Sequence, residues 1–177
     1  MAVRASYRQL PTFQTPPAVL VLVAPYYRGI ADMQLAGARA VLAAAGAAEQ
    51  VLEVPGALEI APAIRFAAEA RRFEAYVALG CVIRGATTHY EIVCNESARG
   101  ITLLGVQAGL AIGNGILTCE TEAQAEERAD PARLDKGGDA AEAALRLAAL
   151  ARRFRTDPGP GGLDHLFAGA GQFPRTA

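Results

Sequence analysis

The segment at 83–91 (IRGATTHYE) contains residues that could bind an anion and move a proton. Thr88 and the glutamate three residues later have the spacing of a capping box, which predicts that a helix begins there. Free backbone N–H groups and the helix dipole favour an anion such as phosphate at this point, beside Ala86 and Thr87. His89 would lie in the first turn, where the dipole favours the neutral ring that suits a proton carrier. An ordinary capped helix with a surface histidine would give the same pattern, so both interpretations stay open.

Two further charged residues lie at the ends of expected helices. Glu59 would lie in the first turn of a helix over 57–72, where its carboxylate could bond ligand hydroxyls or simply complement the dipole. Arg128 would end a helix over 121–129. Its guanidinium could bind a phosphate with two hydrogen bonds, or it could stabilise the negative end of the helix and do nothing more.

Aromatic rings and thiols are the remaining candidates for chemistry. Tyr26 and Tyr27 follow the first apolar run and could form a stacking platform or pack in a contact between subunits. The spacing of Cys81, His89 and Cys94 fits no standard zinc pattern. Cys81 would lie inside an apolar strand, where thiols are usually inert. We therefore expect neither a metal site nor a cysteine nucleophile.

Short apolar runs alternate along the chain with segments of helical periodicity. Strands are expected over 19–24, 51–54, 76–83 and 111–117. Helices are expected over 31–45, 57–72, 88–107, 121–129 and 138–154. This alternation predicts βαβ units, and hence a parallel sheet with helices on both faces. Because ligands of such sheets bind outside the carboxyl ends of the strands, the candidate residues above would gather at one edge.

Composition limits the class of protein. The chain has 177 residues and 52% apolar residues, which fits one globular domain. A net charge of −1 gives no basic excess for a nucleic-acid backbone, so no nucleic-acid partner is expected. The longest apolar run near the N-terminus is far shorter than a membrane span, so no membrane association is expected either. Three cysteines form no disulfide framework, and we expect a reduced, cytoplasmic protein.

Three regions follow from these patterns. Residues 1–16 form a polar arm interrupted by proline, and 17–154 form the α/β domain. Residues 155–177 are rich in glycine and proline, a composition that predicts a flexible or loosely docked tail.

The sequence resembles the lumazine synthase family over roughly residues 17–153. The matching segments are VPGALEI (54–60), ALGCVIRGATTHYEIVCNESARGI (78–101), GILT (115–118), EAQAEERA (122–129) and DKGGDAAEAAL (135–145). The long central segment is the most specific of them. The resemblance implies a flavodoxin-like three-layer fold with about four parallel strands. It also implies assembly as a homopentamer or a multiple of five.

The resemblance implies a reaction as well. The family joins 5-amino-6-ribitylaminouracil to 3,4-dihydroxy-2-butanone 4-phosphate, releases phosphate and forms 6,7-dimethyl-8-ribityllumazine, the penultimate step of riboflavin biosynthesis. The two small-molecule substrates form the Schiff base between themselves. No metal and no organic cofactor takes part.

The resemblance also implies roles for the residues of this sequence that match the family's motifs. Those that would hold the pyrimidine ring and its ribityl chain are Tyr26, Ala57, Leu58, Glu59, Cys81, Val82 and Ile83. Those that would hold the phosphate are Ala86, Thr87 and Arg128, and His89 would carry the proton. Two neighbouring subunits share each pocket in the family, and Asn114 and Arg128 would come from the second one.

Two alternatives share the fold. An archaeal-type riboflavin synthase would use lumazine itself, and the phosphate set of Thr87 and Arg128 argues against it. A non-catalytic shell or flavin-binding protein gains slight support from Asn114, which stands where many members of the family have phenylalanine. The presence of His89 and Arg128 argues against this second alternative.

Overall fold

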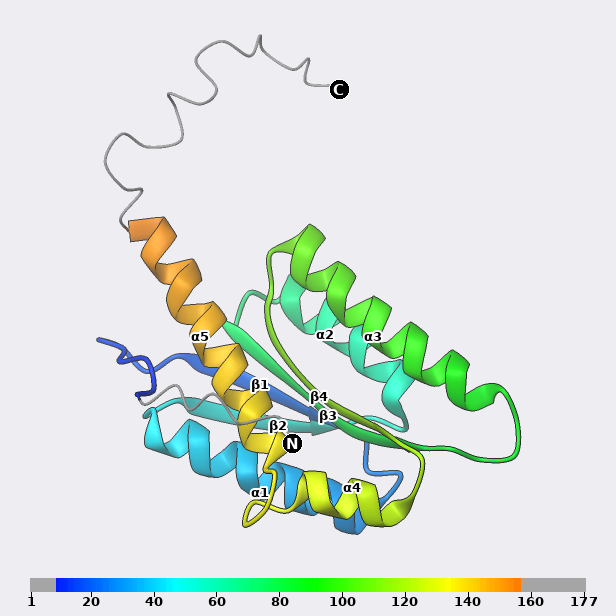
Figure 1. The fold of residues 1–177 in the computed structure, drawn as a ribbon. Coiled ribbons are helices and arrows are strands. Elements are labelled where there is room, and N and C mark those ends of the chain that lie inside the picture. Colours follow the sequence, from blue (N-terminus) through cyan, green and yellow to red (C-terminus); the bar gives the residue numbers. More distant parts are fainter. Residues whose placement is uncertain (1–8, 157–177) are drawn as a thin grey trace, which may run out of the picture.

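A computed structural model describes residues 9–156 as four strands and five helices in alternating order (Figure 1). The strands are β1 (Ala18–Val23), β2 (Ala48–Glu53), β3 (Ala75–Ile83) and β4 (Ala111–Cys119). The helices are α1 (Arg28–Ala44), α2 (Ala57–Glu69), α3 (His89–Ala108), α4 (Glu122–Ala129) and α5 (Lys136–Thr156). Most of the tail expected over 155–177 lies outside the described residues, and so does the first half of the arm.

All strand pairs are parallel, and the strand order is β2-β1-β3-β4. Helices α2 and α3 cover one face of the sheet, and α1, α4 and α5 lie on the other (Figure 1). The predicted three-layer α/β fold is confirmed, and the strand order is that of flavodoxin-like sheets. The chain runs outward from β1 to β2 and then returns to β3. The switch point of the sheet therefore lies between β1 and β3.

The core explains why β1 reads as an unbroken apolar run. Val19, Val21 and Val23 point toward α1 and α5, whereas Leu20 and Leu22 point toward α2 and α3. Side chains alternate across a strand, so a strand covered on both faces must be apolar at every position. The edge strand β2 is different: it is largely exposed and begins at Ala48, three residues before the predicted start.

Helix α5 packs very closely on β4. An added Cβ at Gly113 would lie 1.8 Å from the Ala140 carbonyl oxygen, and one at Gly137 would lie 2.0 Å from the Gln34 carbonyl oxygen. Both distances are far below contact range, so only glycine fits at these positions. Gly113 thus lets α5 lie directly against β4, and Gly137 lets the start of α5 lie directly against α1, which contains Gln34.

Replacing Gly113 by alanine is expected to lower the free energy of unfolding by about 1–3 kcal/mol, because α5 must shift to admit the methyl group. Urea denaturation at fixed protein concentration measures the change. Gly29→Ala is the matched control, since a Cβ there meets no atom within 4 Å. Equal stability of the two variants would contradict the close approach of α5.

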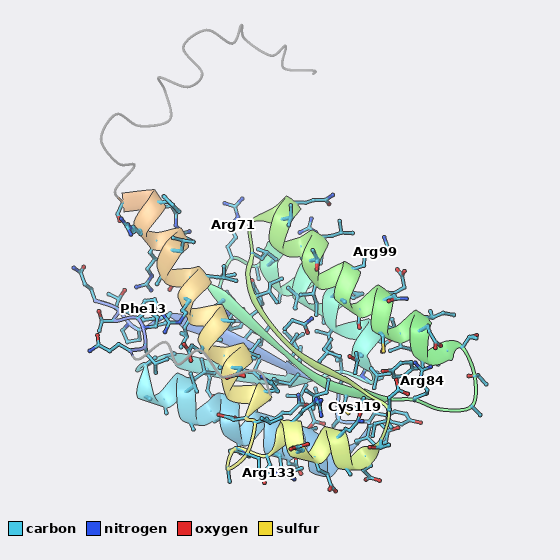
Figure 2. The ribbon with its side chains drawn as sticks, viewed as in Figure 1. Phe13, Arg71, Arg84, Arg99, Cys119 and Arg133 are labelled. Carbon is cyan, nitrogen blue, oxygen red and sulfur yellow. The ribbon has the colours of Figure 1, made fainter. Side chains whose placement is uncertain are left out.

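The last residues of the arm are docked on α5. The guanidinium carbon of Arg152 lies 5.0 Å from the centre of the Phe13 ring, and its Nη1 donates to the Thr15 carbonyl oxygen at 3.0 Å. The same guanidinium pairs with Glu74, just before β3. Phe13 accordingly lies beside α5 in Figure 2. Within residues 9–156, no helix has the length and apolar character needed to cross a membrane.

Candidate active site

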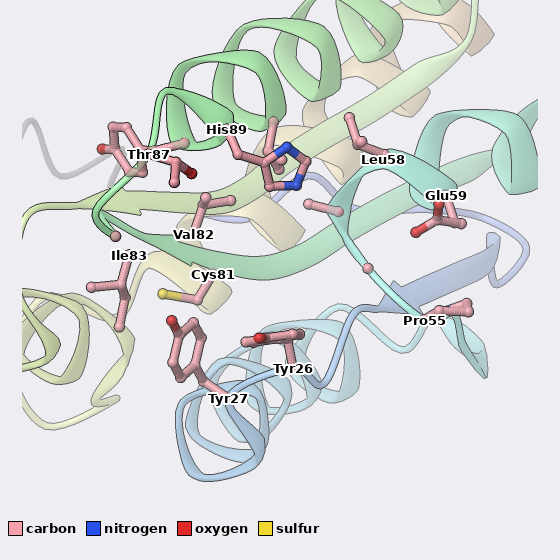
Figure 3. Close-up of a pocket in the computed structure, with 15 residues that line it drawn as sticks. Tyr26, Tyr27, Pro55, Leu58, Glu59, Cys81, Val82, Ile83, Thr87 and His89 are labelled. Carbon is pink, nitrogen blue, oxygen red and sulfur yellow. The ribbon is translucent and has the colours of Figure 1, made fainter.

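A pocket of about 510 Å³ lies outside the carboxyl ends of β1, β2 and β3, at the switch point of the sheet (Figure 3). Its walls are the loop after β1, the start of α2, the end of β3, and the loop that leads into α3. The lining residues are Tyr26, Tyr27, Pro55, Gly56, Ala57, Leu58, Glu59, Cys81, Val82, Ile83, Gly85, Thr87, His89, Tyr90 and Val93.

Most of the residues singled out from the sequence meet in this pocket. Those that line it are Tyr26, Ala57, Leu58, Glu59, Cys81, Val82, Ile83, Thr87 and His89. Ala86 lies in the same loop but not in the lining. Asn114 and Arg128 lie elsewhere on this chain. Asn114 lines a separate cavity of about 240 Å³ between β4 and α5, together with Lys136 and Asp139.

Tyr26 presents an aromatic face to the pocket. Its side chain is 77% exposed, and its ring stands edge to face against Tyr27, with 5.1 Å between centroids. Figure 3 shows the two rings on one side of the pocket and Thr87 and His89 on the other. Burial, followed by the neighbouring Tyr26, raises the pKa of Tyr27. The inner ring is thus a support that stays neutral, and the outer ring is free to stack on a planar ligand.

Helix α2 begins at the pocket without a side-chain cap. Its N-cap is Gly56, which has no side chain, and the only acidic residue of its first turn is Glu59. Ala57 is buried and Glu59 is exposed. Uncapped first-turn N–H groups can donate to ligand hydroxyls, while the Glu59 carboxylate can accept from them.

Helix α3 also begins at the pocket, and the capping box predicted for it is wrong. Thr88 precedes the helix as expected, but its backbone is already helical (φ −66°, ψ −1°) and its side chain makes no cap bond. Glu91 pairs with Arg84 instead of the backbone of Thr88. The first N–H groups of this helix consequently keep their capacity to bind an anion, beside the exposed His89.

Arg128 lies in the last turn of α4, where its Nη1 donates to the Gln124 carbonyl oxygen at 3.0 Å. The predicted cap at the other end of α4 is present, because Thr121 Oγ1 accepts from the Gln124 N–H at 3.3 Å. Neither Arg128 nor Thr121 lines the pocket of its own chain.

The cysteines do not have the character of nucleophiles. Burial raises the pKa of Cys81 to about 12, with smaller effects from Cys119 and Cys94. The thiol of Cys81 therefore stays protonated near neutral pH and contributes only an apolar surface. Across residues 9–156, no three His, Cys, Asp or Glu side chains come together in a way that could hold a metal ion.

Tyr90 and Val93 were missed as pocket residues by the sequence reasoning. Both lie on α3 just after His89, and Val93 is one turn further along the same face. For Val93, the helical spacing of four residues from His89 was the available signal, whereas no spacing signal marks Tyr90, which directly follows His89.

The sheet order, and a pocket at the switch point between uncapped helix starts, define a flavodoxin-like α/β protein of the kind that binds ligands at this edge. Residues 17–152 match the family model of 6,7-dimethyl-8-ribityllumazine synthase. The chain belongs to this family.

Curated relatives agree with the family match. A 6,7-dimethyl-8-ribityllumazine synthase of Jannaschia sp. (strain CCS1) is 55% identical over 150 residues, which cover 85% of this chain and 84% of the relative. The enzyme of the same name from Erythrobacter litoralis (strain HTCC2594) is 58% identical over 135 residues, or 76% of this chain and 96% of the relative. That of Sphingopyxis alaskensis is 56% identical over 136 residues, or 77% of this chain and 96% of the relative.

Proposed function

We propose that this protein condenses 5-amino-6-ribitylaminouracil with 3,4-dihydroxy-2-butanone 4-phosphate to 6,7-dimethyl-8-ribityllumazine. The observation that carries the proposal is the family match over 17–152, which includes every residue of the pocket lining. In this reaction the 5-amino group attacks the ketone and water leaves. Phosphate is then eliminated, and the second amine closes the ring with loss of another water. No residue of the protein forms a covalent bond, and no metal or organic cofactor is needed.

The pyrimidine substrate would bind between the aromatic face and the end of β3. Tyr26 is proposed to stack on the ring, and the backbone of 81–83 to bond its polar edge. The ribityl hydroxyls would meet the start of α2, where Ala57 and Leu58 offer backbone N–H groups and Glu59 offers a carboxylate. These assignments are supported by the position of all three segments around one pocket.

The phosphate group would bind at the uncapped start of α3. Ala86 and Thr87 lead into this helix, and the dipole favours a negative charge there. His89, the first residue of the helix, is proposed to carry a proton between the amine, the ketone and the leaving phosphate. Arg128 of a neighbouring subunit would complete the phosphate site, and Asn114 of that subunit would line the ring.

We propose a homopentamer, or a multiple of five subunits, located in the cytoplasm. Asn114 and Arg128 lie outside the pocket of their own chain, so a second copy is required to bring them to it. Large apolar side chains also remain exposed on α3, among them Val106 at 80% and Ile92 at 53%. Exposed apolar residues on one helix favour contact with another subunit.

The direct test supplies the purified protein with both substrates and follows phosphate release and the fluorescence of the lumazine. We expect both products to form at equal rates. Supplying lumazine alone is the control, since a riboflavin synthase would consume it. Riboflavin formation from lumazine, or no reaction with either substrate set, would contradict the proposal.

We also propose that residues 17–154 form the catalytic domain and that the chain after it is dispensable. The family match ends at 152 and α5 ends at Thr156. Removing 157–177 is therefore expected to leave the number of subunits in the assembly unchanged. The kcat/KM should stay within about twofold of that of the full chain. A truncated protein that no longer assembles would show that this segment is part of the structure.

A further inference from the structure

Arg84 connects three separate parts of the chain, and two of them, the end of β3 and the start of α3, line the pocket. It directly follows β3, and its backbone N–H donates to the Cys119 carbonyl oxygen at the end of β4, at 2.9 Å. Its Nε donates to Glu120 Oε2 at 2.5 Å, and its Nη1 donates to Glu91 in the first turn of α3. One side chain thus ties the end of β3 to the end of β4 and to the start of α3.

The same guanidinium also contacts a pocket residue. Its central carbon lies 4.1 Å from the centre of the Tyr90 ring, within the range of a cation–π interaction. Hydrogen bonds to Glu120 and Glu91 raise the pKa of Arg84, and Arg84 lowers the pKa of Glu91, so Arg84 and Glu91 both stay charged near neutral pH. Single exposed ion pairs add little stability, but a network of several contacts can fix a geometry.

The segment between Arg84 and His89 has few other supports. No side chain caps α3, and a Cβ added at Gly85 would meet no atom within 4 Å. Gly85, Ala86 and Thr87 are all exposed. Arg84 holds this loop at its first residue and also holds the helix turn that follows it, as a capping interaction would otherwise do.

We infer that Arg84 is a positioning residue for the phosphorylated substrate. It does not touch the reacting atoms. It fixes the loop at 85–88, and the first turn of α3 with His89, relative to the end of β3. The inference rests on the proposed function, because it assigns this loop to the phosphate of the butanone.

The test compares Arg84→Ala and Arg84→Lys with Arg99→Ala. Arg99 is the matched control, because it also pairs on α3, with Glu96, but lies further along the helix and away from the pocket (Figure 2). Misplacing a bound group by about 1 Å can lower the reaction rate on the order of 100-fold. For Arg84→Ala we therefore expect KM for the phosphorylated butanone to rise about tenfold, with KM for the pyrimidine within about twofold. The KM of Arg84→Lys for the phosphorylated butanone should lie between those of the wild type and Arg84→Ala, because lysine keeps the charge but not the planar guanidinium.

Glu120→Gln gives an isosteric second variant if Arg84→Ala assembles poorly. It should show the same selective rise in KM, and faster amide hydrogen exchange over 85–89, while Arg99→Ala shows neither. A general loss of stability would instead lower the active fraction and leave both KM values unchanged. That result, with an active wild type, would overturn the role of Arg84 alone. A wild type that forms no lumazine would overturn the proposed function and this inference together.

Discussion

Arg128→Ala is expected to lower kcat/KM for the phosphorylated butanone by about 10- to 150-fold. This corresponds to the loss of a charge-assisted hydrogen bond, about 1.5–3 kcal/mol. Arg128 already bonds the Gln124 carbonyl through one nitrogen, which leaves the rest of its fork for a phosphate. Loss of the guanidinium would also release the ketone from its position near the amine. Arg128→Lys should recover part of the effect, because a point charge replaces a bidentate contact.

His89→Ala is expected to have the smaller effect on kcat/KM for this substrate. The amine and the ketone can react without strong activation, so the enzyme would act mainly by holding them close together in the correct orientation. Water and the substrate phosphate can also move protons, and the loss should stay below the ~10²–10⁴-fold typical of acid–base catalysis. Steady-state kinetics of both variants decide the order. An inactive His89→Ala beside a nearly normal Arg128→Ala would show that proton transfer dominates.

The fold could be predicted from the sequence because both faces of the central strands are covered. Short continuous apolar runs such as those of β1 and β3 are typical of that setting, and they placed both strands correctly to within one residue. The edge strand β2 was predicted to start too late, because its first three residues are exposed and two of them, Glu49 and Gln50, are polar and interrupt any apolar run. Backbone pairing with β1 alone makes them a strand.

The candidate site could be predicted in part for a related reason. Loops that follow parallel strands must meet at one edge, so their position in the chain was enough to bring Tyr26, Glu59 and His89 together. Contacts within that edge were not predictable. The spacing of Thr88 and Glu91 suggested a capping box, but Glu91 bonds Arg84, a partner seven residues away. Local spacing cannot show which of two competing partners a carboxylate takes.

The close packing of α5 could not be predicted from the sequence either. Glycines at 113 and 137 lie far apart in the chain, and only the tertiary structure brings each of them against a carbonyl group. A glycine in a strand indicates a bulge or a close approach without naming the partner. The same limit applies to Asn114 and Arg128, whose proposed partner is another copy of the chain.

Mixed assemblies of two impaired variants are expected to regain activity. Tyr26→Ala should weaken stacking in the pocket of its own chain by roughly tenfold or more, while Arg128→Ala should impair the pocket of a neighbour. In a closed ring of subunits, each interface joins the pocket face of one subunit, which carries Tyr26, to the face of its neighbour that carries Arg128. Random mixing in equal amounts then gives about one quarter of sites with both faces intact, since each face is intact half the time.

The measurement uses co-expressed variants with different tags, purified through both tags so that every assembly contains both chains. Activity is followed at substrate concentrations below KM, where the single variants are weakest. Tyr26→Ala mixed with His89→Ala is the matched control, because both residues line the pocket of one chain, and no mixture of the two can form an intact site. Recovery in the first mixture and not in the second would establish that Arg128 acts across a subunit boundary. If verified mixed assemblies stayed as weak as the parent variants, Arg128 would have to act within its own chain, although it lies outside the pocket lining there.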